Sequence, residues 1–211
     1  MRKAILLAAE MTALFVVIPL LFYYRVLPNV PLPFLLLTVV VVYLFLRRDP
    51  TFDRRHLWKF SGVRNGLKPI LIRAAVLCTL LGLGVWLFMP DRLFSFVRRA
   101  PVFWAVIMVL YPLLSVYPQE VLFRAFFFHR YRQLFGQGVI TVVASAVLFG
   151  FVHIVFGRWI SVLLSGAGGF LFASTYFHSG SLALACIEHA VYGNFIFTIG
   201  LGEFFFHGAR R

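Results

Sequence analysis

The sequence predicts an all-α fold, a polytopic membrane helix bundle with about seven transmembrane helices. Of the 211 residues, 62% are hydrophobic and only 13% are charged. Soluble domains typically carry about 25% charged residues, so water would not solvate the surface of such a chain. The apolar residues gather in runs near the ~20 residues that cross a bilayer, and clusters of breaker residues separate these runs.

The candidate spans follow one another along the whole chain. They cover residues 4–24, 30–46, 70–89, 102–117 continuing into a further helix, 138–156, 159–177 and 181–206. Pro112 and Pro118 interrupt the fourth span. Because proline suits the first turn of a helix, we expect the helix to restart at Pro118 after a kink. The unbroken series of spans predicts a single membrane domain, residues 1–211.

The net charge of +13 resides mainly between the spans. This pattern is typical of cytoplasmic loops that attract anionic lipids, and we exclude nucleic acid as a partner. Membrane lipids are the expected partners, in a multi-pass protein of the bacterial cytoplasmic (inner) membrane. One loop holds seven of the 20 lysines and arginines: Arg47, Arg48, Arg54, Arg55, Lys59, Arg64 and Lys68.

Three apolar segments carry polar residues that lipid would not tolerate. Ionisable side chains at a helix centre in hydrocarbon cost about 2.5–3.5 kcal/mol each, so they usually face a bundle interior or a wet cavity. We therefore expect these residues to converge inside the bundle. They are Gln119, Glu120 and Arg124 in the first segment, His153 in the second, and His189 with Asn194 in the third.

The spacing of these residues predicts which of them share a helix face. Glu120 and Arg124 are four residues apart, with the acid first, which is the favoured order for an ion pair. Phe149 lies four residues before His153, so its ring can pack under the imidazole. His189 and Asn194 are five residues apart, about 140° around a regular helix, and would converge only through a local π-bulge at Gly193.

A hydrolytic mechanism fits this set of side chains. Glu120 and His153 could hold and deprotonate a water molecule that attacks a peptide carbonyl. His189 and Asn194 could then donate hydrogen bonds to the oxyanion. We expect no cofactor. The alternative is a zinc site made of Glu120, His153 and His189, because two histidines and one carboxylate suit zinc with an open position.

Structural interpretations compete with each of these roles. Glu120 and Arg124 could form an ion pair that only stabilises a kinked span, and His153 could simply bond a neighbouring carbonyl. His189 lies next to Glu188, with which it could pair locally. Glu10, a lone acid in the first span, is expected to pair with Arg73.

The three segments resemble the CPBP family, which includes the CAAX proteases and bacteriocin-processing (Abi) enzymes. The family pattern is EExxxR, FxxxH and HxxxN or HxxxD on separate spans. Here these motifs are residues 119–124, 149–153 and 189–193. The resemblance implies a catalytic core over residues 101–206, with accessory spans and the basic loop in residues 1–100. It also implies a glutamate-dependent intramembrane endopeptidase that acts on membrane-associated proteins.

Two positions depart from the family pattern. Gln119 replaces the first glutamate, which the family uses as its base, and Gly193 occupies the Asn/Asp position, with Asn194 one residue later. We therefore assign Glu120, His153, His189 and Asn194 as catalytic, supported by Gln119, Arg124 and Phe149. The predicted function is peptide-bond hydrolysis by activated water. The alternative is a catalytically silent member that acts as an immunity factor, scaffold or chaperone.

Overall fold

A bundle of helices makes up the part of the chain that this computed structural model describes, residues 1–28, 30–57 and 63–205. These residues contain no strand, and six of their helices are long and apolar enough to cross a membrane. The six are Arg2–Tyr23, Pro31–Arg48, Val63–Phe88, Pro101–Arg130, Val139–Phe156 and Trp159–Ser179. A seventh apolar helix, Leu182–Thr198, is shorter. The predicted all-α membrane bundle is confirmed, and Lys59 and residue 206 of the predicted segments lie outside the described residues.

The long helices are built from shorter segments. The first span consists of α1 (Arg2–Thr12), η1 (Ala13–Val17) and α2 (Ile18–Tyr23). The second and third are α3 (Pro31–Arg48) and α4 (Val63–Phe88). The fourth consists of α6 (Pro101–Tyr111), η4 (Pro112–Val116), α7 (Tyr117–Glu120), η5 (Val121–Phe126) and α8 (Phe127–Arg130). The fifth is α10 (Val139–Val152) with η6 (His153–Phe156), followed by α11 (Trp159–Ser179) and α12 (Leu182–Thr198).

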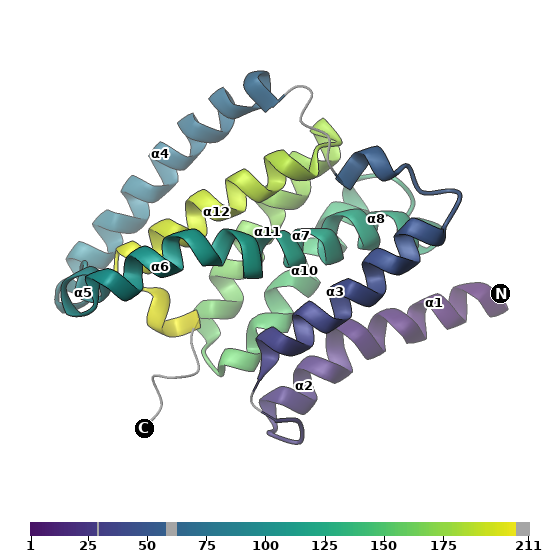
Figure 1. Cartoon of the computed structure of the whole chain (residues 1–211), viewed down its shortest axis with the longest axis horizontal. Helices are drawn as coiled ribbons and strands as arrows, with labels where there is room; N and C mark the ends of the chain where they lie inside the picture. The colour runs from purple at the N-terminus through teal and green to yellow at the C-terminus, as the bar shows by residue number, and fades with distance from the viewer. Residues whose placement is uncertain (29, 58–62, 206–211) are drawn as a thin grey trace.

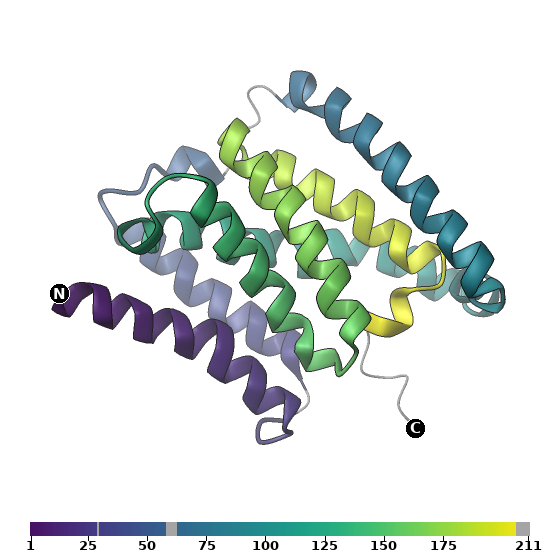
Figure 2. The same cartoon turned by 180° about the vertical axis from the view of Figure 1, so that it is seen from behind.

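Short helices make the remaining connections: η2 (Arg54–Leu57), η3 (Pro90–Arg92), α5 (Ser95–Arg99), α9 (Arg132–Phe135) and η7 (Gly202–Phe205). The fourth span crosses the middle of the bundle, with α12 on one side and α3 on the other (Figure 1). From behind, α10, α11 and α12 lie next to one another (Figure 2). The helix α4 lies at one edge beside α12, and α1 lies at the opposite edge (Figure 1).

The fourth span continues through both prolines instead of breaking. It is π-helical from Pro112 to Val116, and α-helical geometry resumes at Tyr117, next to Pro118. Proline has no N–H, so Pro112 cannot donate to the carbonyl of Met108, four residues earlier. Asn194 on α12 instead donates its side-chain amide to that carbonyl, at 3.2 Å. In a membrane such a replacement matters, because water does not reach freed backbone groups.

Two ion pairs attach the outer helices to the bundle. Glu10 on α1 accepts hydrogen bonds from Arg130 at 2.9 and 2.5 Å and from Tyr131 at 3.1 Å. Arg73 on α4 pairs with Glu188 on α12, which is fully buried. The expected pairing of Glu10 with Arg73 is therefore wrong. Both residues instead pair with charges on the central spans, where each outer helix meets the bundle.

The loop after α3 is attached to the end of the fourth span. His129 donates from Nε2 to Asp49 Oδ2 at 2.9 Å, and the Thr51 hydroxyl donates to Oδ1 at 2.7 Å. The bond from His129, followed by those from Thr51, holds the pKa of the Asp49 carboxyl well below its usual range. A depressed carboxyl pKa stabilises the fold above the unfolded-state pKa and ceases to do so on acidification. This attachment is therefore intact at neutral pH.

Large apolar side chains cover the outside of the bundle. On α4 alone, Leu71, Ile72, Leu80, Leu87 and Phe88 are each more than half exposed. An apolar surface of this extent needs lipid to cover it. The protein is therefore an integral membrane protein.

Glycines bring α10 and α11 close together. A Cβ built on Gly150 would lie 2.8 Å from the Cα of Gly166 and 3.0 Å from the carbonyl oxygen of Val162. A Cβ built on Gly169 would lie 2.9 Å from the ring of Phe149 and 3.3 Å from the Cα of Ala146. The small residues of α11 therefore allow the close contact between the two helices.

We predict that Gly150→Ala destabilises the protein by about 1–3 kcal/mol, because the methyl group meets backbone atoms that do not move aside. Thermal unfolding in detergent micelles measures the effect. Gly166→Ala is the matched control, since its Cβ would lie 3.9 Å from the nearest atom, an ordinary contact. Equal stability of the two variants would contradict the prediction.

Candidate active site

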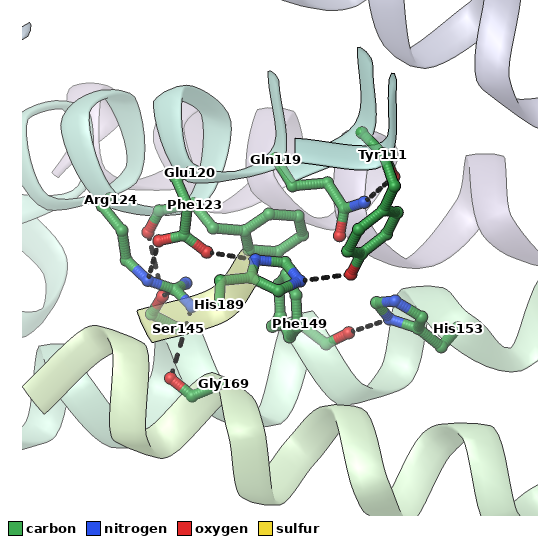
Figure 3. A network of polar contacts seen from close by, with 11 residues as sticks. Tyr111, Gln119, Glu120, Phe123, Arg124, Ser145, Phe149, His153, Gly169 and His189 are labelled. Carbon is green, nitrogen blue, oxygen red and sulfur yellow. Dashed lines mark hydrogen bonds and ion pairs between the residues drawn. The ribbon is translucent and has the colours of Figure 1, made fainter. Parts of the chain in front are cut away.

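Arg124 and Glu120 form a fully buried ion pair. Both side chains are 0% exposed, and Arg124 Nε lies 3.0 Å from Glu120 Oε2 (Figure 3). The predicted pairing across one helical turn is confirmed. Arg124 also donates from Nη1 to the Ser145 hydroxyl at 3.0 Å and from Nη2 to the Gly169 carbonyl at 3.4 Å. One guanidinium thus joins the fourth span to α10 and α11.

His189 on α12 occupies the other oxygen of Glu120. Its Nδ1 lies 2.9 Å from Glu120 Oε1, and because a carboxylate only accepts, Nδ1–H is the donor. The imidazole stacks on Phe172, with centroids 4.4 Å apart and planes 14° apart. Phe149 meets the same imidazole edge-on at 5.5 Å. The two aromatic rings fix the orientation of His189, and the carboxylate keeps its Nδ1 protonated.

The second nitrogen of His189 contacts a tyrosine. Nε2 lies 3.0 Å from the hydroxyl of Tyr111, the last residue of α6 (Figure 3). A chain of hydrogen bonds therefore runs from Glu120 through His189 to Tyr111. Its inner members are closed off from solvent, since Glu120 is 0% and His189 5% exposed.

Tyr111 lines a cavity of about 630 Å³ beside this chain. The walls are largely apolar and come from α2, α3, the fourth span and η6. Among the residues described, those lining the cavity include no aspartate or glutamate. Its polar lining residues are Thr38, Tyr111, Ser115, Gln119 and His153.

His153 begins η6, where α10 ends. Its Nδ1 lies 2.6 Å from the carbonyl oxygen of Phe149, so Nδ1–H donates there. The Phe149 ring lies 4.9 Å from the imidazole, as the spacing predicts. With Nδ1 protonated, the neutral ring has its acceptor at Nε2.

Gln119 points to the cavity, whereas its neighbour Glu120 points away from it. The Gln119 amide donates to the Ser115 hydroxyl at 2.7 Å (Figure 3). Successive helical residues differ by about 100° in direction, so one of the two must turn inward when the other faces the cavity. The side that faces Arg124 is the buried side.

The structure thus brings four of the seven expected site residues into one cluster: Glu120, Arg124, Phe149 and His189. Gln119 and His153 lie at the cavity beside it. Asn194 joins neither group, because its amide donates to the Met108 carbonyl. The expected π-bulge at Gly193 is wrong, since α12 is α-helical through Leu182–Thr198. Two π-helical segments lie in the fourth span instead, on both sides of Glu120, and a further one, η1, lies in the first span.

Sequence reasoning missed three residues of the cluster. Tyr111, Ser145 and Phe172 contact His189 or Arg124, and each belongs to an apolar span in which it matches no motif. The one available signal was position: Ser145 lies four residues before Phe149, on the face that carries the FxxxH motif.

The zinc alternative requires Glu120, His153 and His189 to share one ion. Within residues 1–28, 30–57 and 63–205, no group of three His, Cys, Asp or Glu side chains is arranged to hold a metal. The two free cysteines, Cys78 and Cys186, add no such group there. The expectation of no cofactor, with zinc as the alternative, stays a prediction.

The fold and these contacts define a polytopic membrane protein with a buried acid–histidine pair beside an apolar cavity. Residues 101–196 match the family model described as type II CAAX prenyl endopeptidase Rce1-like. The match confirms the resemblance to the CPBP family, and it supports an intramembrane endopeptidase of the CAAX protease type acting on a membrane-associated protein. No curated protein and no solved structure matches the chain. The division into residues 1–100 and 101–206 stays a prediction.

We predict that Glu120→Gln destabilises the protein by about 3–5 kcal/mol, because it leaves the buried Arg124 without its counter-charge. Equilibrium unfolding in mild detergent measures the loss. Glu203→Gln is the control: Glu203 pairs with Arg92 and Arg99, but its side chain is 36% exposed, so the loss should stay below about 1 kcal/mol. If Glu120→Gln is as stable as the wild-type protein, the Glu120–Arg124 pair does not hold the fourth span to α10 and α11.

Proposed function

We propose that this protein is an intramembrane endopeptidase that hydrolyses a peptide bond of a membrane-associated protein with a water molecule held at His153. One observation carries the proposal: the Glu120–His189–Tyr111 chain ends at the same cavity that His153 and Gln119 line. The cavity is therefore lined by a base, His153, by an amide, Gln119, and by Tyr111, the end of the hydrogen-bond chain that begins at the charged Glu120. That space is shielded by apolar walls, which strengthens electrostatic effects inside it.

His153 is the proposed general base. Its Nε2 takes a proton from water while the water oxygen forms a bond to the substrate carbonyl carbon. The carbonyl electron pair moves to oxygen and gives a tetrahedral oxyanion. When the oxyanion collapses, the C–N bond breaks and the proton on His153 passes to the leaving nitrogen. The products are a carboxylic acid and an amine, and the histidine returns to its starting state.

Glu120 supports this chemistry from one step away. A side chain that is 0% exposed cannot touch the water directly. Its carboxylate instead orients His189 and stabilises the imidazolium form of that ring, as an acid does for a catalytic histidine in many hydrolases. Gln119 is the polar group next to the water site: one amide N–H binds Ser115, and the amide has a second N–H and a carbonyl oxygen with which to position water.

The cavity suits the apolar part of a substrate. Its volume of about 630 Å³ lies within the range of small-ligand sites, about 300–1,000 Å³. Side chains from α2 and α3 form one wall, so the accessory spans contribute to substrate binding. A protein segment embedded in or attached to the membrane would present its apolar part to these walls and its peptide bond to His153.

A second function is favoured by a specific observation. The family's base position holds the neutral Gln119, and that amide, not Glu120, lines the cavity. A chain without a carboxylate at this place could bind membrane-associated partners without cutting them. It would then act as an immunity factor, scaffold or chaperone. The two functions share the cavity and differ in the role of His153.

We predict that His153→Ala lowers kcat at least about 100-fold, because a general base contributes about 10²–10⁴. Processed protein termini from membranes with and without the protein identify a substrate, whose cleavage is then measured in proteoliposomes. The matched control is His178→Ala, which loses the same local bond to the carbonyl four residues earlier, at 2.8 Å, but lies outside the cavity. Absence of cleavage by the wild-type protein would favour the non-catalytic function.

We predict that Gln119→Glu raises the rate of cleavage at least about tenfold, because it adds a carboxylate base to the cavity. Gln133→Glu, on the exposed side of α9, adds the same charge elsewhere and should change nothing. If Gln119→Glu creates activity in an inactive wild-type protein, the chain is a silent member with an otherwise complete site. A folded but unchanged variant would show that position 119 takes no part in catalysis.

The zinc alternative is tested in the same assay. Without a metal role, a chelator leaves the cleavage rate unchanged. Loss of activity with the chelator and its recovery on adding zinc would support a site of Glu120, His153 and His189 that forms when substrate binds.

A further inference from the structure

We propose that Tyr111 is a further catalytic residue, whose hydroxyl carries the effect of the buried Glu120–His189 pair to the substrate carbonyl. The inference rests on the proposed endopeptidase function and deepens it. None of the three sequence motifs contains this residue. Its role follows from its place between the buried pair and the cavity.

Tyr111 is the member of the hydrogen-bond chain that reaches the cavity. Glu120 is 0% and His189 only 5% exposed, so neither presents a surface to a substrate. Tyr111 lines the cavity and lies 3.0 Å from His189 Nε2. Whatever the buried pair contributes to chemistry in the cavity must therefore pass through this hydroxyl.

A hydroxyl is suited to this position because it has one hydrogen and two lone pairs. Tyr111 can accept a hydrogen bond from His189 Nε2–H and at the same time donate its own hydrogen into the cavity. This arrangement requires the imidazolium form of His189, which keeps a proton on each nitrogen throughout the reaction and donates Nδ1–H to Glu120 and Nε2–H to Tyr111. The positive charge shared along the chain then faces the oxyanion formed when water adds to the carbonyl.

The backbone of α12 leaves room for this ring at Gly193. A Cβ on Gly193 would overlap both the ring and the hydroxyl oxygen of Tyr111. Phe197 holds another side of the ring, with centroids 5.2 Å apart. Glycine at position 193 is thus required by the place of Tyr111, and its departure from the family pattern has a physical reason.

No proton is lost or gained in this role. Tyr111 donates a hydrogen bond to the oxyanion while His153 holds the proton taken from water. When the C–N bond breaks, the oxyanion returns to a carbonyl and the Tyr111 hydrogen bond weakens. The proton of His153 leaves with the amine, and Tyr111 keeps its own hydrogen throughout.

The test is Tyr111→Phe, which keeps the ring that fills the space at Gly193 and removes only the hydroxyl. Loss of one donor to an oxyanion costs about 10²–10³ in kcat, and KM should stay unchanged because the bond strengthens in the transition state. Cleavage in proteoliposomes measures both constants. Tyr24→Phe, whose ring is exposed beyond α2, is the matched control and should behave as wild type.

Gly193→Ala is a second test, because the added methyl group displaces the Tyr111 ring without changing the chemistry of the Tyr111 hydroxyl. If the hydroxyl acts in catalysis, Gly193→Ala also lowers kcat, and it adds little in the Tyr111→Phe background. Effects on kcat that add fully would show that Gly193 does not act through the Tyr111 hydroxyl and would overturn the inference. A kcat of Tyr111→Phe within threefold of wild type would overturn it as well, while the endopeptidase function would stand if His153→Ala is inactive. A wild-type protein without cleavage activity would overturn both proposals.

Discussion

A guanidinium that no water reaches constrains this whole bundle. Arg124 is 0% exposed, and a charge in that position is tolerated only where it is paired and hydrogen-bonded. Glu120 supplies the counter-charge from the preceding turn, Ser145 supplies an acceptor from α10, and the Gly169 carbonyl supplies one from α11. Because these partners come from three helices, satisfying one side chain fixes how the helices pack. Glu120 then has one oxygen left, and His189 binds it from α12.

Backbone groups impose a second constraint, which explains the place of Asn194. Pro112 deprives the Met108 carbonyl of its helical donor, and the membrane offers no water in exchange. The amide of Asn194 donates to that carbonyl and so ties α12 to α6. This bond holds the amide toward Met108, and Asn194 lies about 140° around the helix from His189, so it does not face an oxyanion there. The space beside Gly193 is filled by Tyr111, and the hydroxyl of Tyr111 contacts His189 Nε2, the nitrogen that does not bind Glu120.

The sequence predicts the features of this protein that depend on local patterns. Span lengths follow from apolar runs and breakers, and the Glu120–Arg124 and Phe149–His153 contacts follow from a spacing of four residues. Contacts between residues that are far apart in the sequence could not be predicted from such patterns. The partner of Asn194 lies 86 residues away, and the need for it arises from a proline in another helix. Opposite charge alone predicts a pair of Glu10 with Arg73. In the structure Glu10 pairs with Arg130 and Arg73 pairs with Glu188, because those charges lie on the neighbouring spans.

The adjacent residues Gln119 and Glu120 show how one helix divides structural and chemical roles. Successive residues point about 100° apart, so a span with one face on the charge cluster and one on the cavity gives these two side chains different surroundings. The acid that balances Arg124 must stay buried, and it is therefore unable to act on substrate directly. Position 119 faces the cavity and is free of that structural demand, so it can lose its charge without unfolding the protein. With Gln119, the chain keeps the Glu120–Arg124 pair, the stacked His189 and the cavity. Its chemistry then depends on the imidazole of His153 and the phenol of Tyr111, which line the cavity.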